Sequence, residues 1–267
     1  MWNVGVERLQ HVMWTHSPDY WLGIDACRLL GAKRGDLDVW TFDGTLERTF
    51  RVSHDCVWAV AALPDGEHFV VGLSDVDIVM YHVDGTRVHT FKGHTDEVIA
   101  VAVTRDGQHI ISCSADNTVK VWSVASKSLV STCGEEDNED DDIGHTDSVY
   151  AVAAMPDGQR ILSGGQDRTV AVWLLDGTLK KTFVELHDAA VNALVALPDN
   201  QHALSGSYDT TVKLFNVNDG TVLHSFTHHP GGAMSLALLP DGRRFVSLSR
   251  WEDTTACIVE HGLAPVP

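Results

Sequence analysis

One stretch of the chain, residues 145–183, has the pattern of a small antiparallel sheet. Short runs rich in apolar and β-branched residues alternate along it with turn sequences: 149–153, Pro156-Asp157-Gly158, 160–165, Gln166-Asp167-Arg168, 169–173, Asp176-Gly177 and 178–183. Short strands joined by such turns are typical of consecutive hairpins. Each strand carries so few apolar residues that the sheet cannot bury its face alone. The stretch therefore predicts further copies of itself.

Similar stretches occur on both sides of this one. They begin at histidines that are spaced by 40, 51, 42 and 42 residues, namely His54, His94, His145, His187 and His229. A period of about 40–45 residues with four strands in each repeat predicts a β-propeller, in which every repeat forms one blade.

The leading histidine, the Pro-Asp-Gly turn, the later aspartate and the final tryptophan resemble the repeat of the WD-repeat (WD40-type) family. The resemblance covers essentially the whole chain and implies an all-β fold, a single propeller of four-stranded antiparallel blades. The repeats then occupy residues 11–50, 54–91, 94–133, 145–183, 187–226 and 229–260. Six closed blades are expected, and a truncated seven-bladed propeller is the alternative.

The two ends of the chain complement each other. Residues Val4–Gln10 resemble a fourth strand, whereas the last repeat ends after a third strand expected at 254–260. Propellers of the resembled family commonly begin with the outer strand of the last blade. We therefore expect Val4–Gln10 to complete that blade and close the ring, which removes an unpaired edge. The front half of 11–50 lacks the Pro-Asp-Gly turn, so its strands cannot be placed from the sequence.

Charge and cysteine usage narrow the possible partners and location. The net charge of −18, from 19 basic and 37 acidic residues, disfavours direct binding to nucleic acid and favours basic partners. No apolar run approaches the roughly 18–20 residues of a membrane span, and the first ten residues do not resemble a secretory signal. The five cysteines form no CxxC pair. We expect a monomer in the reducing cytoplasm or nucleus, with the thiols as small packing residues.

An acidic insertion, residues 134–143, lies between the repeats at 94–133 and 145–183. It carries seven acidic residues in the eight positions 135–142, which repel one another and stay solvated. One interpretation is an inert loop; another is an electrostatic attraction for a basic partner. Calcium binding is a weaker interpretation, because the glycine-punctuated spacing of an EF-hand loop is absent.

Histidine, serine and aspartate recur together, as they would in a nucleophilic triad. The recurrence in several repeats argues against catalysis, because an enzyme needs one such site. In the resembled family these residues and the tryptophan form a structural hydrogen-bond network within each blade. The implied members are His94, Ser112, Asp116 and Trp122; His145, Ser163, Asp167 and Trp173; and His187, Ser205 and Asp209, with Phe215 replacing the tryptophan.

Ligands of the resembled family often dock on the face where the first strands begin. Aromatic residues and methionine are enriched at interface cores, and several occur at the positions that alignment places there. The candidate partner-binding residues are Trp58, Ile99, Tyr150, Tyr208, Met234, Glu97 and Asn192. Packing against neighbouring loops is the alternative role for these side chains.

The sequence thus predicts a non-catalytic scaffold or adaptor that binds a protein or peptide around the central channel. A structural subunit that binds through blade edges or the opposite face is the alternative, and a reader of basic peptides is a minor one. First-strand positions are mostly Ala, Val and Leu, and no His/Cys metal spacing occurs. We therefore expect no enzyme activity, no metal and no cofactor.

Overall fold

The structure is a computed structural model that describes residues 19–23, 28–33, 35–41, 45–52, 56–134, 144–227, 231–239, 241–249 and 257–262. These ranges form six antiparallel sheets, here called blades 1 to 6. Blade 1 contains β1 (Asp19–Gly23), β2 (Arg28–Lys33), β3 (Asp36–Thr41) and β4 (Leu46–Arg51). Blade 2 contains β5 (Val57–Ala62), β6 (His68–Leu73), β7 (Ile78–His82) and β8 (Arg87–Phe91).

The remaining blades repeat this order. Blade 3 contains β9 (Val98–Val103), β10 (His109–Ser114), β11 (Val119–Ser123) and β12 (Ser128–Cys133). Blade 4 contains β13 (Val149–Ala154), β14 (Arg160–Gly165), β15 (Val170–Leu174) and β16 (Leu179–Phe183). Blade 5 contains β17 (Val191–Ala196), β18 (His202–Ser207), β19 (Val212–Asn216) and β20 (Val222–Phe226), and blade 6 contains β21 (Ala233–Leu238), β22 (Arg244–Ser249) and β23 (Cys257–Gly262).

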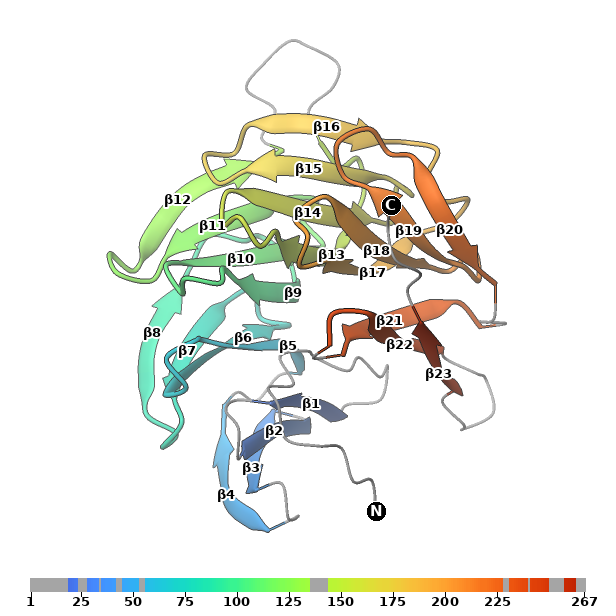
Figure 1. Ribbon diagram of the computed structural model, residues 1–267. Coiled ribbons are helices and arrows are strands. Elements are labelled where there is room, and N and C mark those ends of the chain that lie inside the picture. Colours follow the sequence, from blue (N-terminus) through green and yellow to red (C-terminus); the bar gives the residue numbers. More distant parts are fainter. Residues whose placement is uncertain are drawn as a thin grey trace.

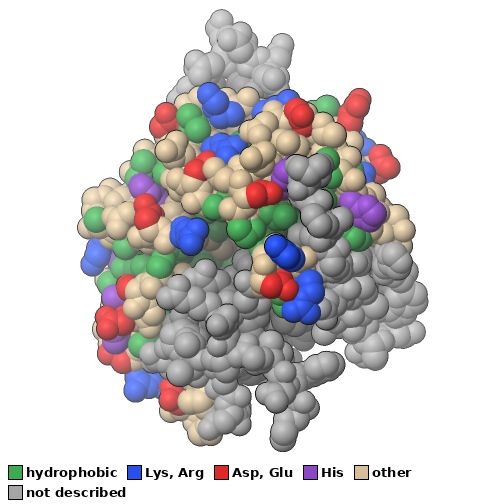
Figure 2. Space-filling model, viewed as in Figure 1, with side chains coloured by type: hydrophobic (Ala, Val, Ile, Leu, Met, Phe, Trp, Pro, Cys, Tyr) green, Lys and Arg blue, Asp and Glu red, His purple; other side chains and the backbone are tan. Residues whose placement is uncertain are grey.

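The blades are arranged radially (Figure 1). The first strands β5, β9, β13, β17 and β21 lie toward the middle, and the fourth strands lie at the periphery. First strands of successive blades contact each other from β1 through to β21. This arrangement confirms the predicted all-β propeller of four-stranded antiparallel blades. Lysine, arginine and acidic side chains are interspersed on the face that Figure 2 shows.

The core lies between blades, as the short strands require. Each apolar cluster draws its side chains from two successive blades; one of them joins Val70 of β6 to Ile110 of β10 and Trp122 of β11. Another joins Leu162 and Val170 of blade 4 to Phe215 of blade 5. Blades 2 to 5 thus each bury one face against the preceding blade and the other against the next blade.

Three expectations for the ends of the chain have different outcomes. The third strand of the last repeat was expected at 254–260, but β23 spans Cys257–Gly262. Residues 257–260 of the expected strand are thus confirmed, the strand continues to Gly262, and residues 254–256 lie outside the described residues. The closing strand Val4–Gln10 lies outside the described residues, so closure stays a prediction. In the repeat at 11–50, the structure supplies the two strands that the sequence could not place, β1 and β2.

The cysteines differ in environment. Cys113 and Cys133 are buried and free, and burial raises the pKa of the Cys133 thiol to about 12. Burial raises the pKa of the Cys113 thiol as well. Both are inert packing residues, as expected. Cys56 is free but exposed, which corrects the expectation for that residue, because it precedes β5 on a loop.

The turn between the second and third strands of blade 5, β18 and β19, gives the first testable prediction. Thr210 has a φ of 73° there, a left-handed conformation that costs a β-branched residue roughly 1–2 kcal/mol. Asn117 occupies the same turn in blade 3 with a φ of 68°, and asparagine tolerates this region. Thr210 is exposed, so its replacement removes no buried contact. We expect Thr210→Asn to raise the free energy of unfolding by about 1 kcal/mol, measured by urea denaturation.

The reciprocal substitution is the control for this prediction. Asn117→Thr should lower the free energy of unfolding by a similar amount, because it places a β-branched residue in the same backbone conformation. If Thr210→Asn leaves stability unchanged while Asn117→Thr lowers it, the strain assigned to Thr210 is absent.

Candidate functional site

The seven candidate partner-binding residues line one pocket, here called the central pocket, with a volume of about 180 Å³. Its lining consists of Trp58, Glu97, Ile99, Tyr150, Asn192, Tyr208 and Met234. They come from blades 2 to 6, so the pocket lies where these blades converge. The structure therefore brings together all seven residues that alignment selected; their role in binding stays a prediction.

A recurring backbone irregularity aims five of these side chains into the pocket. Trp58, Ile99, Tyr150, Asn192 and Met234 each occupy the second position of a first strand. In each of these blades the pairing of the first and second strands shifts at that position, leaving it opposite no partner. Such a β-bulge re-aims a side chain. The flanking first and third residues keep their pairing and stay buried between blades.

Two more lining residues lie next to strands. Glu97 directly precedes β9, and Tyr208 directly follows β18 with 42% of its surface exposed. Gly232 lies against Tyr208, because a Cβ at Gly232 would lie 3.1 Å from Cδ1 of the Tyr208 ring. The lining thus combines accessible aromatic surface with one carboxylate.

The pocket is polar at a few defined atoms. The Tyr150 hydroxyl donates a hydrogen bond to Oε1 of Gln166. Burial raises the pKa of Tyr150, and the nearby Asp147 carboxylate and Tyr208 add to the rise. Asn192 donates from Nδ2 to the Ala190 carbonyl at 3.4 Å. The buried Nε1 of Trp58 has no hydrogen-bond partner among the described residues.

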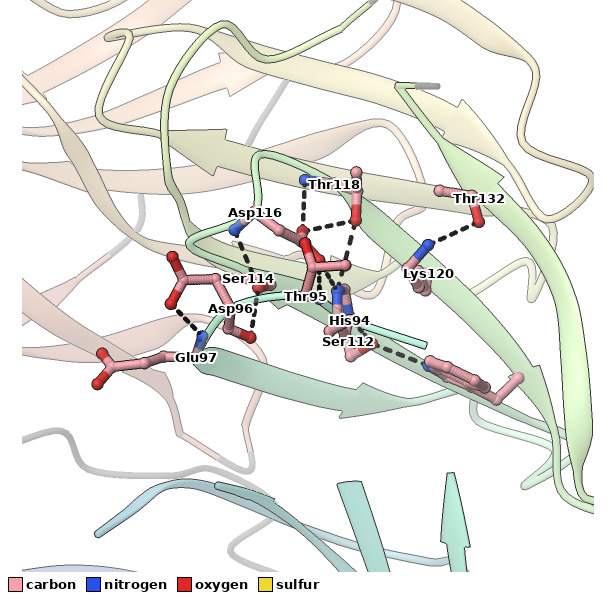
Figure 3. Close-up of polar contacts among 11 residues, drawn as sticks. His94, Thr95, Asp96, Glu97, Ser112, Ser114, Asp116, Thr118, Lys120 and Thr132 are labelled. Atoms are coloured by element: carbon pink, nitrogen blue, oxygen red, sulfur yellow. Dashed lines mark hydrogen bonds and ion pairs between the residues drawn. The ribbon is translucent and has the colours of Figure 1, made fainter. Parts of the chain in front are cut away.

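The histidine networks are built within single blades (Figure 3). In blade 3, Nδ1 of His94 lies 2.7 Å from Oδ2 of Asp116, and Nε2 lies 2.8 Å from Oγ of Ser112. Trp122 donates from Nε1 to the same Ser112 oxygen at 2.9 Å. Since the carboxylate can only accept, His94 donates from Nδ1 and accepts at Nε2 from the serine hydroxyl. The Ser112 hydroxyl therefore donates one hydrogen bond and accepts another.

The aspartate also holds the backbone of two turns. In blade 3 the Asp116 carboxylate accepts from the backbone N–H groups of Thr95 and Thr118. Burial by itself would raise the pKa of Asp116, but the hydrogen bonds that the carboxylate accepts from His94, the Thr118 hydroxyl and the Thr95 backbone hold it well below its usual range. Asp209 has its pKa lowered by the equivalent contacts, against the effect of burial. The charged carboxylate is thus the form that the folded blade requires.

Blade 4 repeats the full network, and blade 5 repeats it without the indole. Trp173 donates to Ser163 at 2.7 Å, and His145 bridges Ser163 and Asp167. His187 bridges Ser205 and Asp209, and Phe215 donates nothing. The three serines are fully buried. Their hydroxyls cannot reach a substrate, so these arrangements stabilise turns and do not present a nucleophile.

Blade 2 departs from the network. In blade 2, Val71 and Tyr81 replace the serine and tryptophan, and the Tyr81 hydroxyl donates instead to the Val52 carbonyl at 3.1 Å. His54 and His229, which lead the repeats of blades 2 and 6, lie outside the described residues, as does Asp253.

Sequence reasoning missed a second set of pairs on the opposite face. The aspartate of the Pro-Asp-Gly turn bonds the residue three positions later, as in Asp65–His68 at 2.7 Å and Asp241–Arg244 at 2.6 Å. Arg160 extends this pattern between blades, because it bonds Asp157 and also donates to the Asn200 carbonyl of blade 5. The recurrence of Asp-x-x-His or Asp-x-x-Arg in the sequence could have predicted these pairs.

The described residues contain no group of three or more His, Cys, Asp or Glu that could hold a metal ion. Within the same ranges, no helix is long and apolar enough to cross a membrane.

Comparisons with known proteins agree with this architecture. The family model for the WD domain, G-beta repeat, matches residues 85–123, 141–173 and 177–216. An uncharacterized WD repeat-containing protein of Schizosaccharomyces pombe (strain 972 / ATCC 24843) is 36% identical over 62 residues, which are 23% of this chain and 10% of that protein. This chain thus matches about a tenth of the length of that relative.

Among solved structures, the crystal structure of the WD40 beta propeller domain of Doa1 is similar, with a TM-score of 0.75 and 25% sequence identity. The alignment covers 94% of this chain and 81% of the Doa1 chain. Three matched repeats, a WD-repeat relative and a WD40 propeller neighbour agree with the blade order and the histidine networks described above. The chain thus carries WD40 repeats at three positions and has the fold of a WD40 β-propeller.

Proposed function

We propose that this chain is a non-catalytic scaffold that binds a protein or a peptide over the central pocket. WD40 propellers are generally protein-interaction scaffolds and are generally not enzymes, which supports this class of function. The observation that carries the proposal is the set of five bulged side chains that five blades turn into one pocket. A bulge forfeits strand pairing, so five of them in one place favour a use for the side chains they display.

The chemistry of the pocket suits an interface. Trp58, Tyr150 and Tyr208 offer large rigid surfaces, and tryptophan and tyrosine are the side chains most often found at the centre of interfaces. The pocket adjoins exposed surface at Tyr208, so a partner can reach it without rearrangement of the blades. Tyr208 is exposed, Trp58 and Tyr150 are partly exposed, and apolar surface of this kind generally marks an interaction site.

The partner is proposed to be basic, and the chain by itself to be a monomer. The net charge of −18 attracts cationic surfaces and repels nucleic acid. The acidic insertion lies outside the described residues, and its sequence favours the same kind of partner. The free thiols of Cys56, Cys113 and Cys133 suit a reducing cytoplasm or nucleus.

A second candidate is a structural subunit that binds through blade edges. The outer strands β12 and β20 contain no charged residue, and they expose Leu129, Val130, Val222 and Leu223 by 43–48%. By contrast, β16 carries Lys180 and Lys181, which discourage pairing at its edge. Uncharged edges are the surface that such a subunit would offer to a neighbouring chain.

A comparison of two variants separates these candidates. Trp58→Ala/Tyr150→Ala removes two aromatic side chains from the central pocket, and Leu129→Ser/Val130→Ser removes the apolar surface of the β12 edge. We expect the pocket variant to lose a captured partner, with affinity lowered by about a hundredfold or more, since truncation of such anchors costs about 2 kcal/mol or more each. The edge variant should retain it. Affinity capture with mass spectrometry, followed by titration of the captured protein, makes the comparison.

Thermal unfolding of both variants is the control, because neither set of side chains belongs to the fully buried core. If the folded pocket variant retains every partner and the edge variant loses them, the scaffold proposal fails in favour of the structural subunit.

A further inference from the structure

We infer that the central pocket receives a single cationic side chain, lysine or arginine, from the bound peptide, with Glu97 as its counter-charge. The inference rests on the proposed function and specifies the chemistry of its ligand. Four features of the described residues support it: an uncompensated carboxylate, the absence of lining cations, aromatic walls and a small volume.

Glu97 is the single charged residue of the pocket lining, and it has no ion-pair partner within the described ranges. Its backbone N–H is held by Oδ1 of Asp96 at 2.8 Å, which fixes the start of β9. Figure 3 shows that its side chain points away from the His94 network, in contrast to its neighbour Thr95. The blade therefore fixes the backbone of Glu97, and no hydrogen bond or ion pair within the described ranges engages its carboxylate.

The charges around the pocket do not compensate Glu97. Asp147 lies close enough to contribute to the raised pKa of Tyr150, so the local potential becomes more negative toward blade 4. Lys92 pairs with Asp77 at 3.6 Å, and Arg168, at the turn after Asp167, does not line the pocket. A carboxylate without an ion-pair partner favours a ligand that brings a positive charge.

The walls suit the rest of a lysine or arginine side chain. Trp58, Tyr150 and Tyr208 present aromatic rings, whose faces attract ammonium and guanidinium groups. Ile99 and Met234 offer apolar surface for the methylene stem, which both cationic side chains bury readily. Amide-bearing Asn192 leaves a polar contact for the peptide backbone.

The volume of the pocket limits what enters it. About 180 Å³ is below the roughly 300–1,000 Å³ of pockets that enclose small-molecule ligands. One long side chain therefore fills the pocket, while the rest of the peptide lies across the face outside it.

The test uses four pentapeptides and calorimetric titration of the full chain. The probes are acetyl-Gly-Ala-X-Ala-Gly-amide with X as arginine, citrulline, lysine or acetyl-lysine, so each cation has a neutral partner of similar shape. We expect the arginine or the lysine peptide to bind at least about tenfold more tightly than its neutral partner, as charge-assisted hydrogen bonds and cation–π contacts imply. The two pairs show which cation the pocket prefers.

Two matched variants locate the effect. Glu97→Gln should abolish the preference for the charged peptide, whereas Asp188→Asn should keep it. Asp188 is exposed in the equivalent loop of blade 5, outside the pocket lining, and both changes remove one negative charge. Long-range attraction is therefore altered equally in the two variants.

Equal affinity for charged and neutral peptides, a preference that survives Glu97→Gln, or no binding of any peptide up to about 10 mM would overturn the inference; that ceiling corresponds to a few kcal/mol of binding free energy. The proposed function is tested separately from this inference. If a captured partner is lost in Trp58→Ala/Tyr150→Ala but held equally by Glu97→Gln, the face binds a partner and only its cationic anchor is wrong.

Discussion

Ser163→Ala is expected to lower the free energy of unfolding by about 2–4 kcal/mol. It leaves two buried polar groups without a hydrogen-bond partner, at a cost of about 1–3 kcal/mol each. Ser163 is fully buried, accepts the indole N–H of Trp173 at 2.7 Å and donates to Nε2 of His145 at 2.7 Å. A methyl group can do neither. The space it leaves is too small and too enclosed for a water molecule to restore both contacts. Urea denaturation followed by circular dichroism measures the loss.

Blade 5 provides the matched control within the same chain. Ser205 is equally buried and contacts His187 at 2.7 Å, but Phe215 stands where the tryptophan would donate. Ser205→Ala therefore leaves one buried polar group without a partner, where Ser163→Ala leaves two, and it should lower the free energy of unfolding by about half as much. Equal losses for the two variants would show that the indole hydrogen bond contributes nothing, and a larger loss for Ser205→Ala would contradict the argument.

The repeat could be predicted from the sequence because each blade is specified locally. Turn sequences such as Pro156-Asp157-Gly158 and β-branched runs such as 169–173 determine their own backbone conformations. The network residues could be found for the same reason, since the resembled repeat keeps His145, Ser163 and Asp167 at fixed spacings. Once one blade was aligned, the side chains of the central pocket followed by position.

What could not be predicted depends on relations between strands. The bulges that aim Trp58 or Tyr150 into the pocket arise from the register of two paired strands, which a single strand does not record. The hydrogen bond from Arg160 to the Asn200 carbonyl joins two blades, and no spacing in the sequence predicts it. Strand β1 could not be placed from the sequence, because its repeat lacks the Pro-Asp-Gly turn that marks most of the others.

The contact between blades 4 and 5 gives the second large effect. Gly164 lies in β14, and a Cβ at this position would be 2.6 Å from Cγ1 of Val191 and 3.0 Å from its Cβ. Val191 is fully buried in β17 and β-branched, so it cannot turn aside. Gly164 needs no left-handed conformation, and the cost of a side chain here is therefore steric alone. We expect Gly164→Ala to lower the free energy of unfolding by about 2–3 kcal/mol, the range for overpacked cores.

A double-mutant cycle tests the cause directly. Val191→Ala removes the Cγ1 methyl group that the new Cβ would meet at 2.6 Å, so Gly164→Ala should cost about 1 kcal/mol or less in the Val191→Ala background, a coupling that distant sites do not show. Gly206→Ala is the milder comparison, since its Cβ would lie 3.1 Å from the Cβ and the carbonyl oxygen of Ala233. Additive losses in the cycle would mean that the blades do not meet at these two residues. Strong coupling instead places the close approach of β14 and β17 among the contacts that hold the first strands, and with them Asn192 of the central pocket, in position.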